Sequence, residues 1–491
     1  MRQTYVRRRR GTSVDQVNRR TKIIATIGPA SSDESTLKSM VEAGMDVARL
    51  NLSHGTIDEA VETLRVLRHI SDIADRPLGV MADLPGPKVR IGELDGAVDI
   101  PMDSELLLEP GEGPSTAKRM TVDYEGLLSD VQLGDKLAVG DGTIVLTVTG
   151  HTGDALKARV LFGGRTQGRP GLHIPSDRLK LTTPTRHDLR LLDAMVEQDV
   201  DMIALSFVRS AHDVRRVGLE PAPRGPLVIA KIETRAAVEN LDGIINESGA
   251  IMVARGDLGT ECSIQDLPHL QKEIIARCVA LGRPAITATQ MLESMITAPS
   301  PTRAEASDVA NAVFDGTSGV MLSAETAIGA DPARVVATMA SIAQRADQEF
   351  DYDGWAHQLR REQLGEPLGV DSDVTDVMTM ATWQAAREIN AKAIISITRS
   401  GFTVRAIARF RPKAPILAFS PDERARRQLT LSWGATPLGI DRIDDNVTTV
   451  HVVLESAKAK GFIRAGDVVA VLGGSSATSG ATDTLRMVRC P

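Results

Sequence analysis

Cysteine is scarce in this chain, with only Cys262, Cys278 and Cys490 among 491 residues. Three cysteines cannot all pair in disulfides, and none of them stands in the CxxC spacing of a metal site. Long apolar runs are also missing: no stretch approaches the roughly 20 residues that cross a bilayer, and the basic first residues are not followed by the apolar segment of a signal peptide. We therefore expect a soluble protein of the reducing cytoplasm, with no membrane partner.

A large excess of one charge is missing as well. The 57 basic and 64 acidic residues leave a net charge of -7, which gives no general attraction to nucleic acid or anionic lipid. A local exception is the arginine run at residues 7–10 (Arg7 to Arg10), within an N-terminal arm at residues 1–20. We interpret this run as a solvated or subunit-contacting tail, with polyanion binding as the alternative.

Short runs rich in Val, Ile, Ala and Leu recur along the chain, and most are separated by stretches with helical spacing. Because the runs are apolar on both faces, they are typical of buried parallel strands in βα units. They predict an α/β fold with a closed (β/α)8 TIM barrel, and an open doubly wound sheet is the alternative. The runs are residues 22–27, 46–50, 78–82, 201–205, 227–232, 250–254, 284–288 and 319–322.

The third and fourth runs are separated by about 100 residues, far more than a barrel connection needs. Short alternating segments such as 136–139 and 143–149 fill this stretch, punctuated by Gly-Asp and Gly-Gly pairs, as in β-hairpins. We predict a barrel from residues 21–87 and 184–350, with residues 88–183 inserted as a small β-barrel lid domain. A polar stretch at 351–373 then connects to runs at 393–398, 415–419 and 467–473, which predict a C-terminal α/β domain within residues 351–491.

Polar side chains stand near the ends of most of the predicted barrel strands. The active site of a TIM barrel lies at the carboxyl ends of its strands, and buried strands normally avoid such side chains. We therefore predict that they converge on one pocket. They are Arg49, Asn51, Asp83, Ser206, Lys231, Glu233, Arg255, Asp257, Thr289, Ser323 and Glu325.

Lys231 and Glu233 alternate along one strand, so their side chains project from the same side. A salt bridge at a strand end is the simple interpretation. Asp257 ends the next strand in the segment Arg-Gly-Asp-Leu-Gly, and two neighbouring carboxylates with room for water and substrate oxygens suit Mg²⁺. Arg49 adds a guanidinium fork suited to phosphate. Walker A, GxGxxG, HExxH and GxSxG motifs do not accompany these residues, so those enzyme classes lose support.

The motifs at residues 26–31, 49–55, 231–233, 255–259, 289–295 and 321–326 resemble those of pyruvate kinase, in the same order. The resemblance spans almost the whole chain. It implies transfer of a phosphoryl group from phosphoenolpyruvate to ADP, giving pyruvate and ATP in the last step of glycolysis, by a homotetramer that contains Mg²⁺ or Mn²⁺.

The resemblance also assigns roles to individual residues, carried over position by position. By this resemblance Lys231, Arg49 and Thr289 are the catalytic residues, and Thr289 assists protonation of the enolate through water. Glu233 and Asp257 bind the divalent metal. The substrate lies against Ala254, Arg255, Gly256, Asp257, Ser323 and Glu325 in addition to the catalytic residues. The nucleotide side is formed by Asn51, His54 and Arg90.

One position departs from the pattern of members that require K⁺. Asn51, Ser53, Asp83 and Leu84 match the monovalent-cation site, but Lys88 stands where those members have Glu. An ammonium group at that position resembles members that work without K⁺, so we expect no K⁺ requirement. Segments 84–85 and 171–175 also depart from the commoner versions of the family.

A regulatory site is implied in the C-terminal domain. Thr398, Ser400, Gly401 and Thr403 precede a predicted helix and resemble the family's effector loop, supported by residues 473–476 and 479–480. An ordinary Ser/Thr-rich helix cap is the alternative. The ligand implied is a phosphorylated small molecule.

Two other functions remain open from the residues alone. One is an aldolase or lyase that acts on phosphoenolpyruvate or pyruvate with the same metal pocket, although the β-rich insert argues against it. The other is a binding regulator without catalytic activity, which the presence of Lys231, Glu233, Asp257 and Thr289 disfavours.

Overall fold

The computed structural model describes residues 19–140, 142–365, 374–441, 446–474 and 482–491. Eight parallel strands close into a barrel in the order β1-β16-β15-β14-β13-β12-β3-β2, which confirms the TIM barrel and excludes the open sheet. The closure is explicit in the register, because Lys22 of β1 pairs with Gly319 of β16. The barrel strands are β1 (Lys22–Ile27), β2 (Val47–Asn51), β3 (Gly79–Asp83), β12 (Met202–Leu205), β13 (Leu227–Ile232), β14 (Ala250–Ala254), β15 (Ala285–Ala288) and β16 (Gly319–Leu322).

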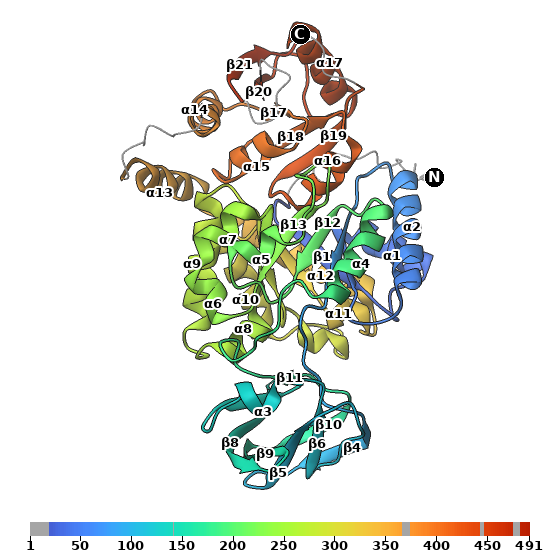
Figure 1. Cartoon of the computed structure of the whole chain (residues 1–491). Coiled ribbons are helices and arrows are strands. Elements are labelled where there is room, and N and C mark those ends of the chain that lie inside the picture. Colours follow the sequence, from blue (N-terminus) through green and yellow to red (C-terminus); the bar gives the residue numbers. More distant parts are fainter. Residues whose placement is uncertain (1–18, 141, 366–373, 442–445, 475–481) are drawn as a thin grey trace.

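Helices surround the barrel and bury one face against it (Figure 1). Three of them begin with capping boxes, at Thr56, Thr185 and Thr302, in which the threonine and the acidic residue three positions later exchange hydrogen bonds with backbone amides. The elements are α1 (Glu34–Ala43), α2 (Ile57–Ile73), α4 (Arg186–Glu197), α5 (Ala211–Arg215), α6 (Arg235–Glu239), α7 (Leu241–Glu247), α8 (Arg255–Glu261), α9 (Leu267–Ala280), η2 (Glu293–Ile296), α10 (Arg303–Phe314), α11 (Ala324–Ala327) and α12 (Pro332–Glu349).

The insert between β3 and α4 forms a separate β domain with its own apolar core. A six-stranded sheet, β11-β7-β8-β9-β5-β6, lies beside the pair β10-β4. Residues 89–92 bridge its two edges, because Arg90 pairs with Gly171 next to β11 and Ile91 pairs with Val122 of β6. This bridge wraps the sheet round on itself, as expected for the predicted small barrel. The elements are β4 (Leu94–Ile100), β5 (Glu105–Pro110), β6 (Arg119–Val122), α3 (Leu127–Asp130), β7 (Lys136–Val139), β8 (Ile144–Thr152), β9 (Ala155–Phe162), β10 (Gly164–Gly168) and β11 (Leu172–His173).

A five-stranded sheet with the order β19-β18-β17-β20-β21 forms the C-terminal domain. Its neighbours are parallel except for the edge strand β21, which runs antiparallel to β20. This domain and the β-rich insert lie at opposite ends of the barrel (Figure 1). The elements are α13 (Tyr352–Gly365), α14 (Val374–Glu388), β17 (Ala393–Ile397), α15 (Phe402–Ala408), β18 (Ile416–Ser420), α16 (Glu423–Gln428), η3 (Leu429–Leu431), β19 (Ala435–Gly439), α17 (Asn446–Ala459), β20 (Val468–Gly473) and β21 (Thr484–Arg489).

The polar stretch at 351–373, predicted as a connection, is helical over Tyr352–Gly365. Its few apolar residues explain why. Ala356 and Leu359 are buried, and the indole Nε1 of Trp355 donates to the carbonyl of Arg409 at 3.0 Å. Because Leu359 lies three positions after Ala356 and four after Trp355, this mostly polar helix presents one apolar face to the protein.

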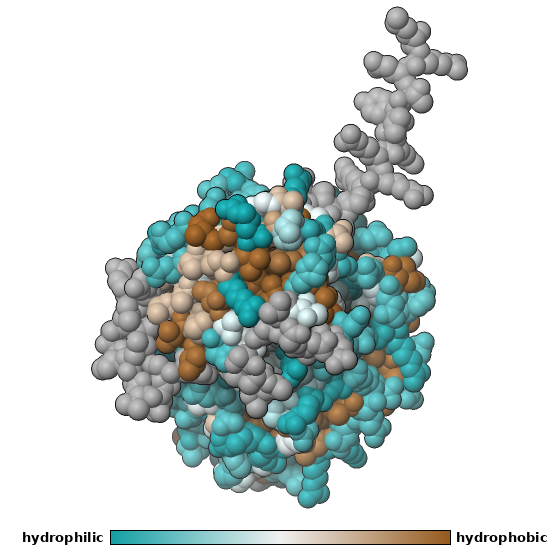
Figure 2. All heavy atoms as spheres, turned by 90° about the horizontal axis from the view of Figure 1, so that it is seen from above, coloured by the Kyte–Doolittle hydropathy of each residue, from teal (hydrophilic) through white to brown (hydrophobic). Residues whose placement is uncertain are grey.

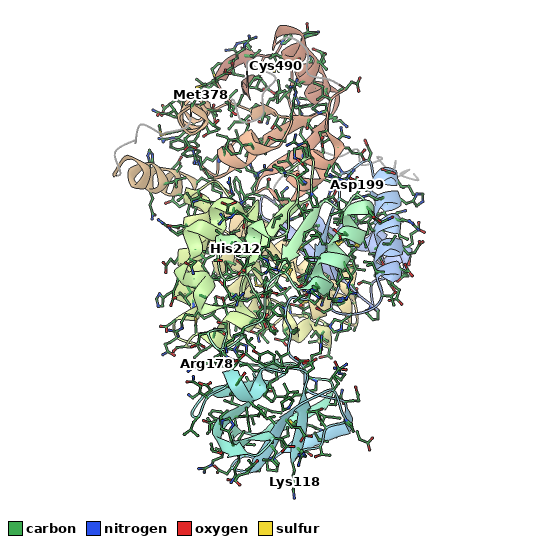
Figure 3. All side chains as sticks on the ribbon, viewed as in Figure 1. Lys118, Arg178, Asp199, His212, Met378 and Cys490 are labelled. Atoms are coloured by element: carbon green, nitrogen blue, oxygen red, sulfur yellow. The ribbon has the colours of Figure 1, made fainter. Side chains whose placement is uncertain are left out.

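Charged groups join the barrel to the C-terminal domain. The buried Asp201 accepts from Arg427 Nε at 2.6 Å and from Arg68 Nη1 at 2.8 Å. Figure 3 labels Asp199, a further Arg427 partner, at this junction, with Lys118 at the far end of the insert. The three cysteines are unpaired. No helix among the described residues combines the length and the apolar character that a membrane span needs.

Candidate active site

A pocket opens at the carboxyl ends of the barrel strands, on the side that faces the insert. It brings together residues from strands that are far apart in the chain, as the strand-end pattern predicted. Its lining consists of Arg49, Asn51, Ser53, Asp83, Pro85, Lys88, Ser206, Phe207, Lys231, Glu233, Met252, Ala254, Asp257, Ala288, Thr289, Met321 and Ser323.

Lys231 lies at the centre of the charged groups. Its Nζ is 2.8 Å from Glu233 Oε1 and 3.3 Å from Asp83 Oδ1, and it donates to Ser206 Oγ at 2.7 Å. Burial alone would lower the pKa of Lys231, but the Asp83 and Glu233 carboxylates outweigh it and raise that pKa. The ammonium group therefore stays charged and fixed at the barrel mouth.

Arg49 is held from two sides. Its Nε donates to Asp83 Oδ2 at 2.7 Å, and its Nη1 donates to Thr26 Oγ1 at 2.9 Å. Burial would raise the pKa of Asp83, yet Lys231 and Arg49 hold it below its usual value. Asp83 is thus an ionised anchor that orients both cations toward the pocket.

The carboxyl group of Glu233 differs from that of Asp83. Burial raises its pKa, opposed by Lys231 and reinforced by the negative charge of Asp257. Its Oε2 accepts from the amide of Phe207 at 2.6 Å, whereas the buried Oε1 has the Lys231 ion pair but no hydrogen bond. A second cation near Glu233 and Asp257 would relieve this repulsion.

A metal would have two carboxylates here rather than a complete protein cage. Within the described residues, no group of three or more His, Cys, Asp or Glu side chains is arranged to hold a metal ion. Glu233 and Asp257 offer hard oxygen donors beside open space. This donor set fits Mg²⁺ or Mn²⁺, because Mg²⁺ commonly keeps waters and takes the remaining oxygens from a substrate.

Thr289 has an unusual backbone. Its φ is +69°, and the next residue, Gln290, has a φ of +54°. Positive φ is rare for a β-branched residue and is concentrated at functional sites. The Thr289 hydroxyl accepts from the amide of Gly256 at 2.9 Å and donates to the carbonyl of Ala288 at 2.7 Å, so it links the ends of two adjacent strands.

Three of the predicted substrate residues do not line the pocket. The Arg255 side chain turns away, donating to Ala288 O at 3.2 Å and pairing with Asp308 at 2.7 Å. Gly256 contributes its amide to Thr289. Glu325 accepts from the amides of Ser323 at 2.6 Å and Leu292 at 3.1 Å. Arg255 and Glu325 therefore hold the loops around the pocket.

Three further predicted residues lie outside the pocket lining. Leu84 is buried, and its carbonyl accepts from Ser206 Oγ at 2.8 Å. His54 is exposed, and partial burial of its ring together with the charges of Arg90, Lys88 and Arg49 lowers its pKa. Arg90 donates to the carbonyl of Arg169 at 3.3 Å. His54 and Arg90 thus belong to a basic rim between barrel and insert.

Ser206, Phe207 and Thr26 contribute contacts that no sequence motif assigned to them. Ser206 stood at a predicted strand end, but its bond to Lys231 depends on the barrel's closure. Phe207 acts through its amide and has a φ of +54°. A backbone donor leaves no trace in residue type, so the sequence carries no signal for it.

Glu261 fastens the insert to the barrel beside this pocket. Its carboxylate accepts from Ser176 N at 2.9 Å and Ser176 Oγ at 2.6 Å, and His173 Nε2 lies 3.0 Å away. Burial would raise the pKa of Glu261, but these hydrogen bonds lower it. We call Glu261, His173 and Ser176 the lid latch.

The predicted effector loop begins α15 in the C-terminal domain. Gly401 has a φ of +76°, and its amide donates to Thr398 Oγ1 at 2.9 Å. Thr403 Oγ1 is hydrogen-bonded to Thr482 Oγ1 at 2.6 Å. Residues 475–476 and 479–480, and the arginine run at 7–10, lie outside the described residues.

A closed (β/α)8 barrel, with opposed acidic and basic groups at its mouth and a β domain above them, is a barrel enzyme suited to an anionic substrate. The family profile described as pyruvate kinase, barrel domain, matches residues 18–336, and the profile described as pyruvate kinase, alpha/beta domain, matches residues 376–488.

Curated relatives agree over nearly the full length. A pyruvate kinase from Clostridium acetobutylicum is 36% identical over 95% of this chain and 99% of its own length. A pyruvate kinase from Thermococcus litoralis is 38% identical over 96% of this chain and 99% of its own length. Pyruvate kinase 2 from Synechocystis is 37% identical over 96% of this chain and 79% of its own length. The chain belongs to the pyruvate kinase family of enzymes.

Proposed function

We propose that this protein transfers the phosphoryl group of phosphoenolpyruvate to ADP, which forms pyruvate and ATP in the last step of glycolysis. The observation that carries the proposal is the position of Lys231, with Nζ 2.8 Å from Glu233 and 3.3 Å from Asp83. Arg49 shares the Asp83 anchor at 2.7 Å. Two cations are thus fixed beside one another by carboxylates of the same pocket.

In this mechanism the chain's own residues bind and orient the transferring group. Arg49 and Lys231 neutralise the phosphoryl oxygens while the bond to the enol oxygen breaks and the bond to a β-phosphate oxygen of ADP forms. Lys231 needs no rearrangement, because Asp83 and Ser206 already hold it. Because these charges are already in place, the site needs little rearrangement to stabilise the transition state of phosphoryl transfer.

Glu233 and Asp257 would hold the divalent metal. When bound, Mg²⁺ or Mn²⁺ would neutralise negative charge on the reactants and orient their oxygens. The position of both carboxylates in the lining of one open pocket supports these residues as ligands.

The enolate left after transfer must gain a proton at carbon. Thr289, whose hydroxyl is fixed between Gly256 and Ala288, lies at the pocket and is our candidate for positioning the water that delivers it. The backbone around Gly256 and Asp257, together with Thr289, would hold the substrate carboxylate, and Ala254 and Ser323 would make further substrate contacts. His54, Asn51 and Arg90 form the nucleotide side.

A coupled assay of purified protein tests the reaction. We expect pyruvate release from phosphoenolpyruvate that requires both ADP and Mg²⁺, with ATP formed in equal amount. Carbon–carbon bond cleavage without nucleotide would instead indicate a lyase. Binding of phosphoenolpyruvate without turnover would indicate a regulator, and either result would end the proposal.

We further propose that the enzyme needs no K⁺. Lys88 lines the pocket with Asn51, Ser53 and Asp83, and no ion pair with a described residue engages its ammonium group. That group would supply the charge that K⁺ supplies elsewhere. The test is turnover in buffer free of sodium and potassium, with Lys88→Glu as the matched variant: the wild type should be active and the variant should gain a K⁺ requirement. Wild-type activity that collapses and returns with K⁺ would refute this.

A phosphorylated small molecule is our proposed effector at Thr398, Ser400, Gly401 and Thr403, on the strength of the family resemblance of this loop. In the structure these residues lie just before and at the N-terminus of α15. Activation or inhibition by members of a panel of sugar phosphates and nucleotides should be lost in Thr403→Ala. An effect that persists in the variant would place the effector elsewhere.

We also propose a homotetramer, in line with the resemblance. The C-terminal sheet has β21 as an edge strand, and α14 packs beside it. Val377 of α14 is 42% exposed and Met487 of β21 is 40% exposed. Viewed from the C-terminal end, the surface includes a broad apolar area (Figure 2), and such areas favour subunit contacts. Sedimentation at micromolar concentration tests the assembly, and a monomer would refute it.

A further inference from the structure

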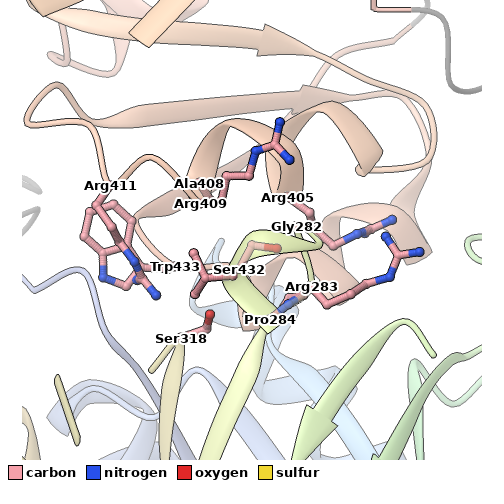
Figure 4. A pocket seen from close by; sticks show the side chains of 11 residues that line it. Gly282, Arg283, Pro284, Ser318, Arg405, Ala408, Arg409, Arg411, Ser432 and Trp433 are labelled. Atoms are coloured by element: carbon pink, nitrogen blue, oxygen red, sulfur yellow. The ribbon is translucent and has the colours of Figure 1, made fainter. Parts of the chain in front are cut away.

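Two arginines meet where the barrel joins the C-terminal domain, at the end opposite the candidate active site. Arg283 follows α9 on the barrel, and Arg405 lies on α15. Figure 4 shows their guanidinium groups side by side at one edge of a small pocket, whereas Arg409 turns away and Arg411 lies against Trp433. Both Arg283 and Arg405 also line a second, larger pocket between the two domains.

The neighbouring arginines each have an acidic or aromatic side-chain partner. Arg409 pairs with Asp376 at 2.7 Å. The Arg411 guanidinium carbon lies 4.4 Å from the centre of the Trp433 ring, a cation–π contact. These two side chains therefore have a structural explanation.

Within the described part of the chain, Arg283 and Arg405 have only carbonyl partners. Arg283 donates to Ser248 O at 2.9 Å and Asn246 O at 3.4 Å, and Arg405 donates to Ser400 O at 3.2 Å. Among the residues that the structure describes, no carboxylate lies within 4.0 Å of either guanidinium. Arg405 Nη1 is buried and has no hydrogen bond.

Burial and, to a smaller extent, the charge of Arg283 together lower the pKa of Arg405 to about 10. Two half-buried like charges without a neighbouring anion are costly. This cost is consistent with a ligand that supplies the missing negative charge.

The acidic side chains of the larger pocket do not supply that charge. Glu247 pairs with Arg215 at 2.7 Å, and Glu220 pairs with Arg224 at 3.2 Å. A further donor is free, because the hydroxyl of the buried Ser248 lacks a hydrogen-bond partner and this residue lines the same pocket.

The rest of the pocket is spacious and mostly apolar. It offers a cavity of about 460 Å³ that opens to solvent, enough for a ligand larger than a bare ion. Its apolar wall includes Val214, Val217, Leu219, Pro221, Leu227 and Phe402.

We propose that Arg283, Arg405 and Ser248 form a second anion site, for a phosphate monoester with a flat, largely apolar body. Two guanidinium forks and a hydroxyl match phosphate oxygens, and the apolar wall packs against the body. The bound anion would bridge the barrel and α15. The site lies at the other end of the barrel from the candidate active site and does not depend on the proposed reaction. It adjoins the proposed effector loop, because Arg405 donates to Ser400 O and Phe402 lines the pocket, but it does not use the hydroxyl groups of that loop.

The probe for the test is 4-bromophenyl phosphate, with its affinity measured by calorimetry on the full chain and its position by the anomalous signal of bromine in a crystal. We expect a bromine peak in this pocket. Arg283→Gln and Arg405→Gln should each weaken binding by about tenfold, the size of a lost charge-assisted hydrogen bond. Arg65→Gln is the control, since this exposed arginine pairs with Glu62 on α2, away from the pocket lining, and it should bind as the wild type does.

Several outcomes would overturn the site. They are a bromine peak elsewhere, equal affinity in Arg283→Gln, or equal binding of 4-bromobenzyl alcohol, which lacks the phosphate. Loss of binding in Thr403→Ala with none in Arg283→Gln would assign the anion to the effector loop. If Arg283→Gln does not fold, Arg283→Lys keeps the charge without the fork and should bind more weakly than the wild type. In addition, the probe should raise the melting temperature of the wild type and not that of Arg405→Gln.

Discussion

Charge compensation decides what single residues do at the barrel mouth. Asp83 is buried and ionised, and it holds Arg49 at 2.7 Å and Lys231 at 3.3 Å. Glu233 has Lys231 as its cation and Asp257 as a negative neighbour. Each charge is thus fixed by another, so that removing one leaves a buried partner uncompensated.

Replacing Lys231 tests this arrangement at the level of one side chain. Lys231→Met keeps the length of the side chain and removes its charge. We expect kcat to fall by about 100- to 1000-fold, the effect of losing one preorganised electrostatic contact. The measurement is steady-state turnover of phosphoenolpyruvate with ADP.

The control is Lys157→Met, which removes a half-exposed lysine paired with Glu105 at 2.9 Å in the insert and should leave kcat within about twofold of the wild type. Retention of full activity in Lys231→Met would contradict the role of this ammonium. A melting curve of each variant separates loss of activity from loss of fold.

Contacts between elements set how the insert meets the barrel. The lid latch joins α8, through Glu261, to the segment around β11, through His173 and Ser176. Two short hydrogen bonds to Ser176 satisfy both carboxylate oxygens. The latch is therefore a defined point at which the insert can be released.

Glu261→Gln should loosen the latch, because an amide cannot accept on both of its terminal atoms. We expect faster hydrogen exchange at the Ser176 amide and a higher KM for ADP. Peptide-resolved exchange and steady-state kinetics measure these effects. Glu239→Gln, at an exposed position on α6, is the control. Unchanged exchange at residues 172–178 would show that the latch does not hold the insert.

Within the insert, Asp130 connects α3 to the segment that returns to the barrel. It accepts from Lys180 Nζ at 2.6 Å and from the hydroxyl of Tyr124. The bonds from Lys180 and Tyr124 lower the pKa of Asp130 from 3.8 to about 2. The unfolded chain therefore takes up this proton at a higher pH than the folded chain does.

Asp130→Asn should consequently lower stability in a pH-dependent way. Because the folded pKa is depressed, the stabilising contribution is complete above about pH 4 and is lost as pH falls toward 2. The melting temperature of the wild type should exceed that of the variant at pH 6, and the gap should narrow by pH 3. Asp95→Asn, on the exposed face of β4, should show no such trend. A gap independent of pH would be inconsistent with this account.

The three parts of the molecule are joined by buried charge as well as by apolar packing. Asp201 has no exposed surface and binds Arg427 of the C-terminal domain, Arg68 of the barrel and the amide of Val80 at 2.8 Å. Arg427 also pairs with Asp199. One carboxylate thus connects two domains.

Asp201→Asn should weaken the docking of the C-terminal domain. Removing one member of a buried ion pair costs about 3 kcal/mol, so the first transition in a urea titration should shift to lower denaturant. Asp199→Asn removes a half-exposed partner of the same arginine and should cost less than about 1 kcal/mol. Equal effects of the two changes would show that burial of Asp201 is not what matters.

The sequence by itself determined the barrel strands, the insert and the motif residues. Apolar runs on both faces require burial, so the eight strands could be located, and Lys231 and Glu233 follow from alternation on one of them. The sequence did not predict strands β19 and β21. Pro437 and Gly439 interrupt the apolar pattern of β19, and Arg486 and Arg489 make β21 partly polar. The sequence did not predict helix α13 either, because most of its residues are polar.

Only the tertiary structure decided which side chains share an environment. Barrel closure brings Ser206 to Lys231 and the Phe207 amide to Glu233, while the motif residue Arg255 turns toward Asp308 instead. It also places Arg405 beside Arg283 across a domain boundary. Residue type fixes what a group can bind, but burial and neighbouring charge depend on chain segments far apart in sequence, and no local pattern encodes their meeting.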